Sequence, residues 1–208
     1  MEAAASAAME PLRSTPPVLI LDPGHGGMDG GAVTADGVRE SALNLAIALK
    51  TRDLCFLLGT VPVLTRCSES LEYPDSAETV HEKKLWDQTQ RIAAINAEEN
   101  AVLLSIHQNT YPDPRPCGSE VLYARTAQSD RFAKTVHSNL VQQLCPENRR
   151  VAAPISDSIY LMRHINCPAV LVECGFLSNP TEARRLQDAE YQKMIAVVLT
   201  ASCLQFIG

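Results

Sequence analysis

Residues 18–31 read VLILDPGHGGMDGG, a short apolar run followed by a glycine-rich loop. Its first four residues, VLIL, have the composition of a short buried strand, which the turn sequence Asp22-Pro23-Gly24 brings to an end. The strand therefore places His25 on the rim of a sheet. The glycine loop that follows (residues 24–31) has little side-chain bulk, so a ligand or a metal ion can come close to its backbone.

A phosphate-binding loop is the obvious alternative for so many glycines. The pattern G-x-G-x-x-G would need glycine at position 29, where Asp29 stands, and no Gly-Lys-Ser/Thr sequence follows. Nucleotide binding is therefore disfavoured. Taken alone, His25 in such a loop is equally compatible with a structural or merely solvated imidazole, so the rest of the chain must decide its role.

Two further apolar runs end in the same way as the first. AVLLSI at 101–106 is followed by His107, and PAVLV at 168–172 is followed by Glu173. In an open α/β sheet ligands collect at the carboxyl ends of the strands, so His25, His107 and Glu173 are expected to converge. Asn109 lies two residues beyond His107 and is a candidate for orienting a substrate, although a plain polar loop residue explains it equally well.

Apolar runs and amphipathic stretches alternate along the rest of the chain. Helices are expected at 38–58, 81–100, 130–144 and 180–206, and further strands at 61–65 and 119–123. This alternation predicts one α/β domain with a mostly parallel or mixed sheet flanked by helices on both faces. The domain is expected to span residues 18–208, and residues 1–17 to be a flexible arm or an expression remnant.

Composition narrows the class of protein. A chain of 208 residues with 46% hydrophobic and 20% charged residues is a soluble globular domain with a sizeable core. Its net charge of -6 argues against nucleic acid and anionic membranes as partners. No apolar run approaches the length of about eighteen residues that a transmembrane helix needs, and residues 1–17 lack the basic start and apolar core of a signal peptide.

The cysteines point to no special chemistry. Seven are present, an odd number without a C-x-x-C pair, which argues against a disulfide framework or a cysteine zinc site. Cys174 adjoins Glu173 and might be read as a nucleophile. Neighbouring residues in a strand point to opposite faces, however, so a catalytic Cys174 is disfavoured.

Five motifs together resemble those of the zinc-dependent N-acetylmuramoyl-L-alanine amidases. They are DPGHGGMDGGA at 22–32, RESALNLA at 39–46, LTR at 64–66, SIHQN at 105–109 and VECGFLSN at 172–179. Their order and spacing make the resemblance specific, and it covers roughly residues 18–207. The short chain and the phrase GFLSNPTEA further resemble the spore-cortex, germination-type branch, whereas cysteine at position 174 is less usual than a small or β-branched residue.

The resemblance implies one zinc ion per chain, with His25, Glu40 and His107 as ligands and Glu173 as the catalytic carboxylate. Two neutral imidazoles and one carboxylate leave a tetrahedral zinc ion with an open position and a positive charge, at which bound water becomes acidic. Glu173 would take the proton of that water and pass it to the departing amine. By itself, Glu40 also fits an acid that complements the dipole of the helix it begins.

The implied reaction is hydrolysis of the amide between N-acetylmuramic acid and the L-alanine of the stem peptide in peptidoglycan. This substrate implies an extracytoplasmic site of action in the cell wall or spore cortex, with a role in cortex maturation or germination. The segment between His107 and Glu173 is too short for the inserted helix that covers the zinc in larger members of the family. The site is therefore expected to be uncovered, and an activator protein or exposure of the substrate would provide any regulation.

Two other classes of function remain open at this stage. A zinc exopeptidase would usually need a second metal or a pocket for a peptide terminus, and the sequence shows neither signature. A catalytically silent peptidoglycan-binding module would be expected to lack the general base, but Glu173 is present.

Overall fold

The computed structural model describes residues 16–208, so most of the arm expected at 1–17 lies outside the described residues. The strands are β1 (Val18–Pro23), β2 (Val63–Leu64), β3 (Ala101–Asn109), β4 (Glu120–Tyr123), β5 (Ala153–Pro154) and β6 (Ala169–Phe176). The helices are α1 (Glu40–Leu57), α2 (Val80–Ala97), α3 (Ser129–Leu144), α4 (Tyr160–His164), α5 (Pro180–Gln187) and α6 (Ala189–Ile207). Within residues 16–208, none of these helices has the length and apolar character needed to cross a membrane.

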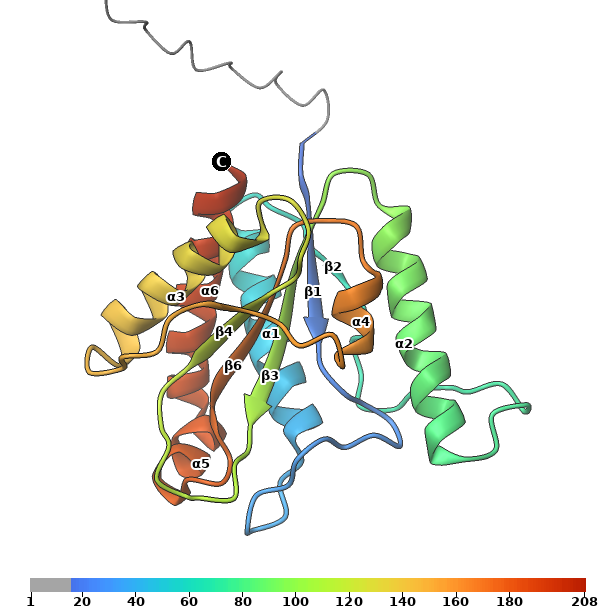
Figure 1. The fold of residues 1–208 in the computed structure, drawn as a ribbon, viewed down its shortest axis with the longest axis horizontal. Helices are drawn as coiled ribbons and strands as arrows, with labels where there is room; N and C mark the ends of the chain where they lie inside the picture. Colours follow the sequence, from blue (N-terminus) through green and yellow to red (C-terminus); the bar gives the residue numbers. More distant parts are fainter. Residues whose placement is uncertain (1–15) are drawn as a thin grey trace, which may run out of the picture.

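The strands form one mixed sheet in the order β2-β1-β3-β6-β4-β5 (Figure 1). Strands β2, β1, β3 and β6 are parallel, and β4 runs antiparallel to β6. The three most buried strands, β1, β3 and β6, thus lie side by side with their carboxyl ends at one edge. In the register, Pro23 pairs with Ile106 and His107 pairs with Glu173, which brings the three strand ends together as expected.

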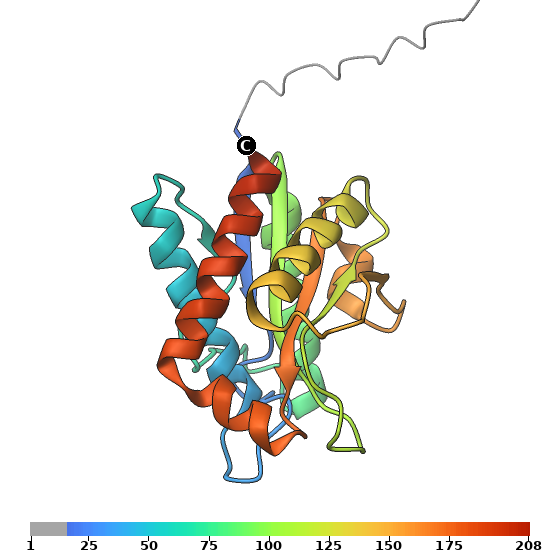
Figure 2. The ribbon, with the colours of Figure 1, turned by 90° about the vertical axis from the view of Figure 1, so that its left-hand side faces the viewer.

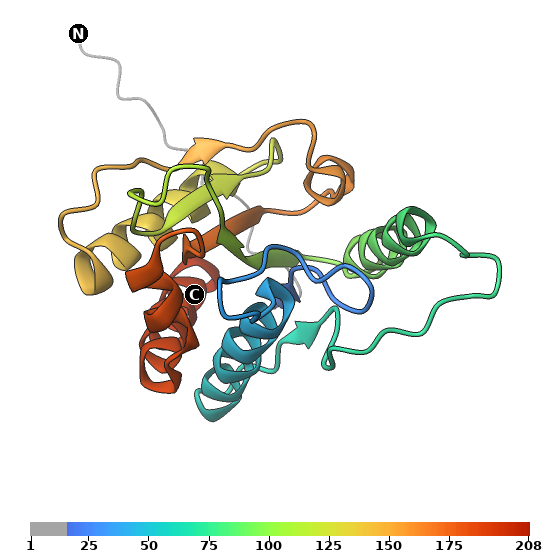
Figure 3. The same ribbon diagram turned by 90° about the horizontal axis from the view of Figure 1, so that it is seen from below.

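Helices cover both faces of the sheet, which confirms the predicted fold class. Leu19 and Leu21 of β1 face the core beneath α1, α3 and α6, whereas Ile20 faces the core beneath α2 and α4. This alternation is that of a strand buried on both sides. Figure 2 shows α6 between α1 and α3 on the first face, and Figure 3 shows α2 standing apart from these three helices.

Two expected elements differ from the structure. The helical region expected at 180–206 is two helices, because Asp188 has an extended backbone (φ -74°, ψ 125°) and its carboxylate accepts a hydrogen bond from the N–H of Tyr191, which starts α6. The strand expected at 61–65 pairs only over Val63–Leu64, since Pro62 has no N–H to contribute to a sheet.

Asp22, at the carboxyl end of β1, links the elements around the sheet edge. Its carboxylate is 1% exposed. It accepts hydrogen bonds from Thr65 Oγ1 at 2.6 Å, Ser105 Oγ at 2.7 Å and Arg91 Nη1 at 2.8 Å. Burial acts to raise the pKa of Asp22, but Arg91 and the hydroxyl donors outweigh it and lower this pKa to about 2. The segment after β2, strand β3 and helix α2 are therefore all tied to the end of β1.

We expect Asp22→Asn to lower the free energy of unfolding by about 3 kcal/mol at neutral pH, because it leaves the buried Arg91 guanidinium without one of its carboxylates. The folded-state pKa of about 2 lies below the ordinary value of 3.8, so the contribution is complete above pH 3.8 and is lost as the pH falls through about 2. Urea unfolding of both proteins at several pH values checks this. The stability gap between them should close in acid.

Asp53→Asn is the matched control for this measurement, because the Asp53 carboxylate is 67% exposed and pairs with its neighbour Arg52. Its effect should stay within about 0.5 kcal/mol. A gap between wild type and Asp22→Asn that did not change with pH would contradict the role given to the ionised carboxylate.

Candidate active site

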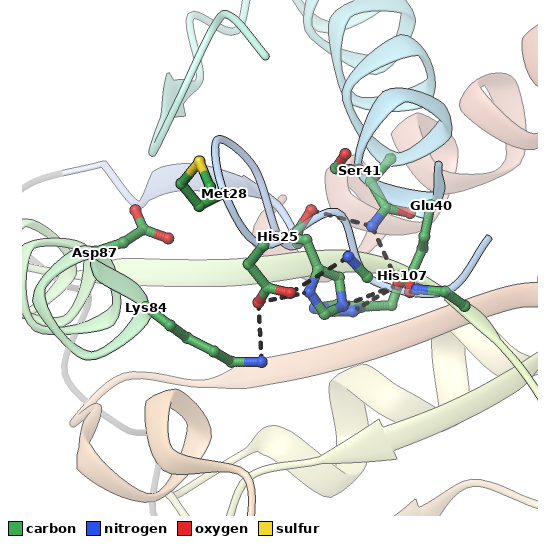
Figure 4. A network of polar contacts seen from close by, with 12 residues as sticks. His25, Met28, Glu40, Ser41, Lys84, Asp87 and His107 are labelled. Carbon is green, nitrogen blue, oxygen red and sulfur yellow. Dashed lines mark hydrogen bonds and ion pairs between the residues drawn. The ribbon is translucent and has the colours of Figure 1, made fainter. Parts of the chain in front are cut away.

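Three predicted residues converge at the carboxyl edge of the sheet. His25 follows β1, Glu40 is the first residue of α1, and His107 lies in β3 (Figure 4). Their potential ligand atoms all lie within 4.8 Å of one another. Glu40 Oε1 is 3.3 Å from His25 Nε2 and 3.1 Å from His107 Nδ1, so one oxygen and two nitrogens face a common point.

The Glu40 carboxylate is held in place by the backbone around it. Its Oε2 accepts a hydrogen bond from the N–H of Ala32 at 2.9 Å, and its Oε1 accepts one from the N–H of Gln108 at 3.1 Å. Asn44 Nδ2 also donates to Oε1, at 3.3 Å. Burial opposes ionisation, but the two imidazoles outweigh it and hold the pKa of Glu40 well below its usual range. Glu40 is therefore a fixed, ionised carboxylate that faces the two imidazoles.

Asp29 orients the ring of His25. Its Oδ2 lies 2.9 Å from His25 Nδ1, which leaves Nε2 facing Glu40, and the same oxygen pairs with Lys84 Nζ at 2.9 Å. A carboxylate behind the ring is a common support for a metal-binding histidine. The local sequence pattern does not reveal this role, because Asp29 stands out there only as the residue that breaks the nucleotide-binding pattern. Its place four residues after His25 was the available signal.

Gly24 and Gly31 must be glycine, because neighbouring side chains leave no room for a Cβ atom at either position. A Cβ on Gly24 would lie 2.2 Å from His107 Nε2, and a Cβ on Gly31 would lie 2.5 Å from Glu40 Oε2. Gly31 also has a positive φ of 67°, as does His25 with φ 61°, a conformation that non-glycine residues seldom adopt. The glycine loop therefore wraps tightly around the three converging side chains.

The converging residues fit a zinc ion. Two imidazole nitrogens and one carboxylate oxygen are the donor types of catalytic zinc sites with an open fourth position. The side chains of His25 and His107 each remain 19% exposed, so solvent can reach the point that the three potential ligand atoms face. This exposure agrees with the uncovered site expected from the short segment between His107 and Glu173.

Glu173, in β6, pairs with His107 of β3 in the sheet register. A cavity of about 440 Å³ is lined by Glu173 together with His25, Glu40 and His107. Glu173 Oε2 is buried and has no hydrogen-bond partner in the part of the chain that the structure describes. Burial raises the pKa of Glu173 to about 7, with Glu40 adding to the effect and His107 opposing it. A carboxyl group with this pKa can both accept and donate a proton near neutral pH.

Asn109 lines the cavity, but its side chain is engaged by the protein. Its Nδ2 donates to Glu120 Oε2 at 2.9 Å, and its Oδ1 accepts from the N–H of Thr110 at 2.8 Å. In this arrangement Asn109 ties the end of β3 to β4, and a contact with substrate stays a prediction. Cys174 points into the core on the other face of β6, where it is 3% exposed and burial raises the pKa of its thiol.

The cavity has one wall on the sheet edge and a second wall on α2 and α4. The second wall includes Lys84, Asp87, Gln88, Arg91, Ile159, Tyr160, Leu161 and Met162. This mixture of charged, aromatic and aliphatic side chains can bind a substrate with both polar and apolar groups. The short helix α4 thus contributes a side wall next to the converging residues.

Comparisons with known proteins give a consistent result. The family model described as N-acetylmuramoyl-L-alanine amidase matches residues 19–203. The germination-specific N-acetylmuramoyl-L-alanine amidase of Bacillus subtilis is 34% identical over 190 residues, which are 91% of this chain and 79% of that protein.

Two solved structures share the fold over nearly the whole domain. The CwlD amidase of Clostridioides difficile, solved in complex with the GerS lipoprotein, has a TM-score of 0.86 and 33% identity, covering 91% of this chain and 98% of that one. An N-acetylmuramoyl-L-alanine amidase from Clostridium difficile 630 has a TM-score of 0.79 and 27% identity, covering 93% and 97%. The resemblance carried by the five motifs is confirmed, and this chain belongs to the N-acetylmuramoyl-L-alanine amidase family.

Proposed function

We propose that this protein is a zinc-dependent amidase that hydrolyses the bond between N-acetylmuramic acid and the L-alanine of the stem peptide in peptidoglycan. The observation that carries the proposal is the meeting, in one cavity, of a His25–Glu40–His107 cluster with the unpartnered carboxyl group of Glu173. The cluster provides the ligands, and Glu173 provides a group that can move a proton.

The chemistry divides between these residues. A zinc ion bound by His25, Glu40 and His107 would polarise the amide carbonyl and make water acidic. Glu173 would accept a proton from the attacking water, whose oxygen bonds to the carbonyl carbon, and would then deliver that proton to the nitrogen as the carbon–nitrogen bond breaks. Its pKa, raised to about 7 by burial, suits both transfers. Glu40 cannot share this task, because both of its oxygens are held by backbone N–H groups.

The likeness to germination-type relatives supports a narrower proposal. The Bacillus subtilis relative is described as germination-specific, and the Clostridioides difficile relative was solved with a lipoprotein. We therefore infer that this chain acts outside the cytoplasm on cell wall or spore cortex, with a protein partner as a candidate activator. Only 5% of its residues are aromatic, so recognition of the polymer should depend on the stem peptide and polar groups more than on sugar stacking.

Glu173→Gln should strongly lower turnover and leave zinc binding intact, because it removes the group that transfers the proton and none of the proposed ligands. We expect a loss of about 10² to 10⁴-fold in kcat. Mass spectrometry of the products released from vegetative and cortex peptidoglycan should detect free stem peptides beginning at L-alanine with the wild type and not with the variant. The exposed Glu147→Gln serves as the matched control and should stay active. A zinc-loaded wild type that releases no such peptide from either wall would point to the exopeptidase alternative or to a missing activator.

His25→Ala and Glu40→Ala should each lower the zinc content below one ion per chain, because each removes one donor from the cluster. Metal analysis of the purified proteins after dialysis measures this directly. His81→Ala removes an exposed imidazole at the start of α2 and should have no effect. Full zinc occupancy in both ligand variants would refute the ligand set.

Activity should fall as the solution becomes acidic, because Glu173 must be ionised to accept a proton. Burial raises the pKa of Glu173 to about 7 in the metal-free protein, and the charge of a bound zinc ion acts in the opposite direction. The acidic limb of kcat/KM is therefore expected below pH 7. Initial rates on a soluble muropeptide across this range test the assignment. If the residual activity of Glu173→Gln falls in acid at the same pH as that of the wild type, the acidic limb belongs to another group.

A further inference from the structure

Helix α2 is attached to the rest of the protein by few apolar contacts. Among its 18 residues only Arg91 and Ile95 are buried, whereas Val80 and Leu85 are 54% and 44% exposed. Apolar burial thus contributes little to holding the first half of this helix, which stands apart from α1, α3 and α6 (Figure 3). The position of α2 depends instead on polar contacts along one face.

That face consists of side chains spaced three or four residues apart, which line up along a helix. They are Lys84, Asp87, Gln88 and Arg91, and all four line the cavity. Figure 4 shows Lys84 reaching from α2 toward the loop that carries His25. The helix therefore meets the cavity with charged and polar groups.

Two of these side chains hold His25 from opposite ends. Arg91 Nη2 donates to the carbonyl oxygen of His25 at 2.7 Å, and Arg91 Nη1 donates to that of Pro23 at 2.8 Å. Lys84 Nζ lies 2.9 Å from Asp29 Oδ2, the oxygen that holds the His25 ring at Nδ1. The unusual backbone conformation of His25 persists only where its surroundings fix it. Here α2 contacts the His25 carbonyl directly through Arg91 and the His25 ring indirectly, through the pair of Lys84 and Asp29.

The other two residues of the cluster do not depend on α2. Glu40 is 4% exposed and bonded by the N–H groups of Ala32 and Gln108, and His107 lies within β3 at the centre of the sheet. A displacement of α2 would leave Glu40 and His107 in place. It would release His25.

We propose that α2 is the positioning element for His25, acting through Arg91 and Lys84, so that zinc binding and docking of α2 favour each other. The inference rests on the proposed metal site. Such coupling is reciprocal. If docking of α2 raises the affinity for zinc by some factor, bound zinc must raise the docking equilibrium constant of α2 by the same factor. Arg91 and Lys84 are positioning residues in this scheme, since neither belongs to the ligand cluster.

Two variants of the full chain test the coupling. Arg91→Lys keeps the positive charge but loses the planar fork that reaches two carbonyl oxygens. Lys84→Met removes a side chain that is 45% exposed, so it should fold even if Arg91→Lys does not. Lys193→Met is the matched control, because Lys193 is 58% exposed and pairs with Glu190 on α6. Circular dichroism checks the folding of each protein.

The readouts are zinc affinity, by competition with a chromophoric chelator, and hydrogen–deuterium exchange with and without zinc. In the wild type, zinc should slow amide exchange in α2 as well as in the glycine loop. Both positioning variants should bind zinc about tenfold or more weakly and lose much of the zinc-dependent protection of α2. Lys193→Met should match the wild type in both readouts.

The outcomes separate this inference from the function on which it rests. If zinc binds the wild type through His25 but leaves exchange in α2 unchanged, or if both positioning variants keep wild-type zinc affinity, the coupling is refuted and the metal site stands. If the wild type binds no zinc, or binds it equally well after His25→Ala, the proposed metal site itself is refuted.

Discussion

The buried pair of Asp22 and Arg91 is the interaction on which the arrangement of the site depends. Asp22 is the last residue but one of β1 and accepts hydrogen bonds from Thr65, just after β2, and from Ser105 in β3. Arg91 binds Asp22 and the carbonyl oxygens of Pro23 and His25. Buried charges are tolerated only when they are paired, so this network admits few alternative geometries. It fixes where the strand stops, how the glycine loop leaves it and where the first converging imidazole lies.

The cavity contains two carboxyl groups that the surrounding structure drives toward opposite protonation states. Glu40 receives hydrogen bonds from backbone N–H groups. The two imidazoles that it faces outweigh the effect of burial and hold its pKa far below the ordinary value. Glu173 is half-buried, its Oε2 has no hydrogen-bond partner among residues 16–208, and desolvation raises its pKa to about 7. Such a separation allows neighbouring carboxyl groups to serve one as a permanent anion and the other as a proton carrier.

Local patterns in the sequence predicted which residues meet at the sheet edge but not the contacts that hold them in place. The apolar runs before His25, His107 and Glu173 are visible in the sequence, and the rule that parallel strands end together places those residues near one another. Glu40 was identified through the family motif, since its own surroundings fit an ordinary helix start equally well. The contact between Arg91 and the His25 carbonyl spans 66 residues of sequence, and no periodic pattern encodes a contact at that distance.

The two walls of the cavity differ in how firmly they are held, and this difference has a functional logic. The sheet edge is part of the buried core, so it can keep Glu40, His107 and Glu173 in fixed relation. The first half of α2, on the opposite wall, has no buried residue and is therefore the part most able to adjust to a bulky polymer, whereas Arg91 and Ile95 anchor the second half. Lys84 in this part of α2 pairs with Asp29, which holds the His25 ring, so an adjustable wall would be joined to one residue of the proposed metal site. A site built in this way would join rigidly held residues to an adjustable wall at His25.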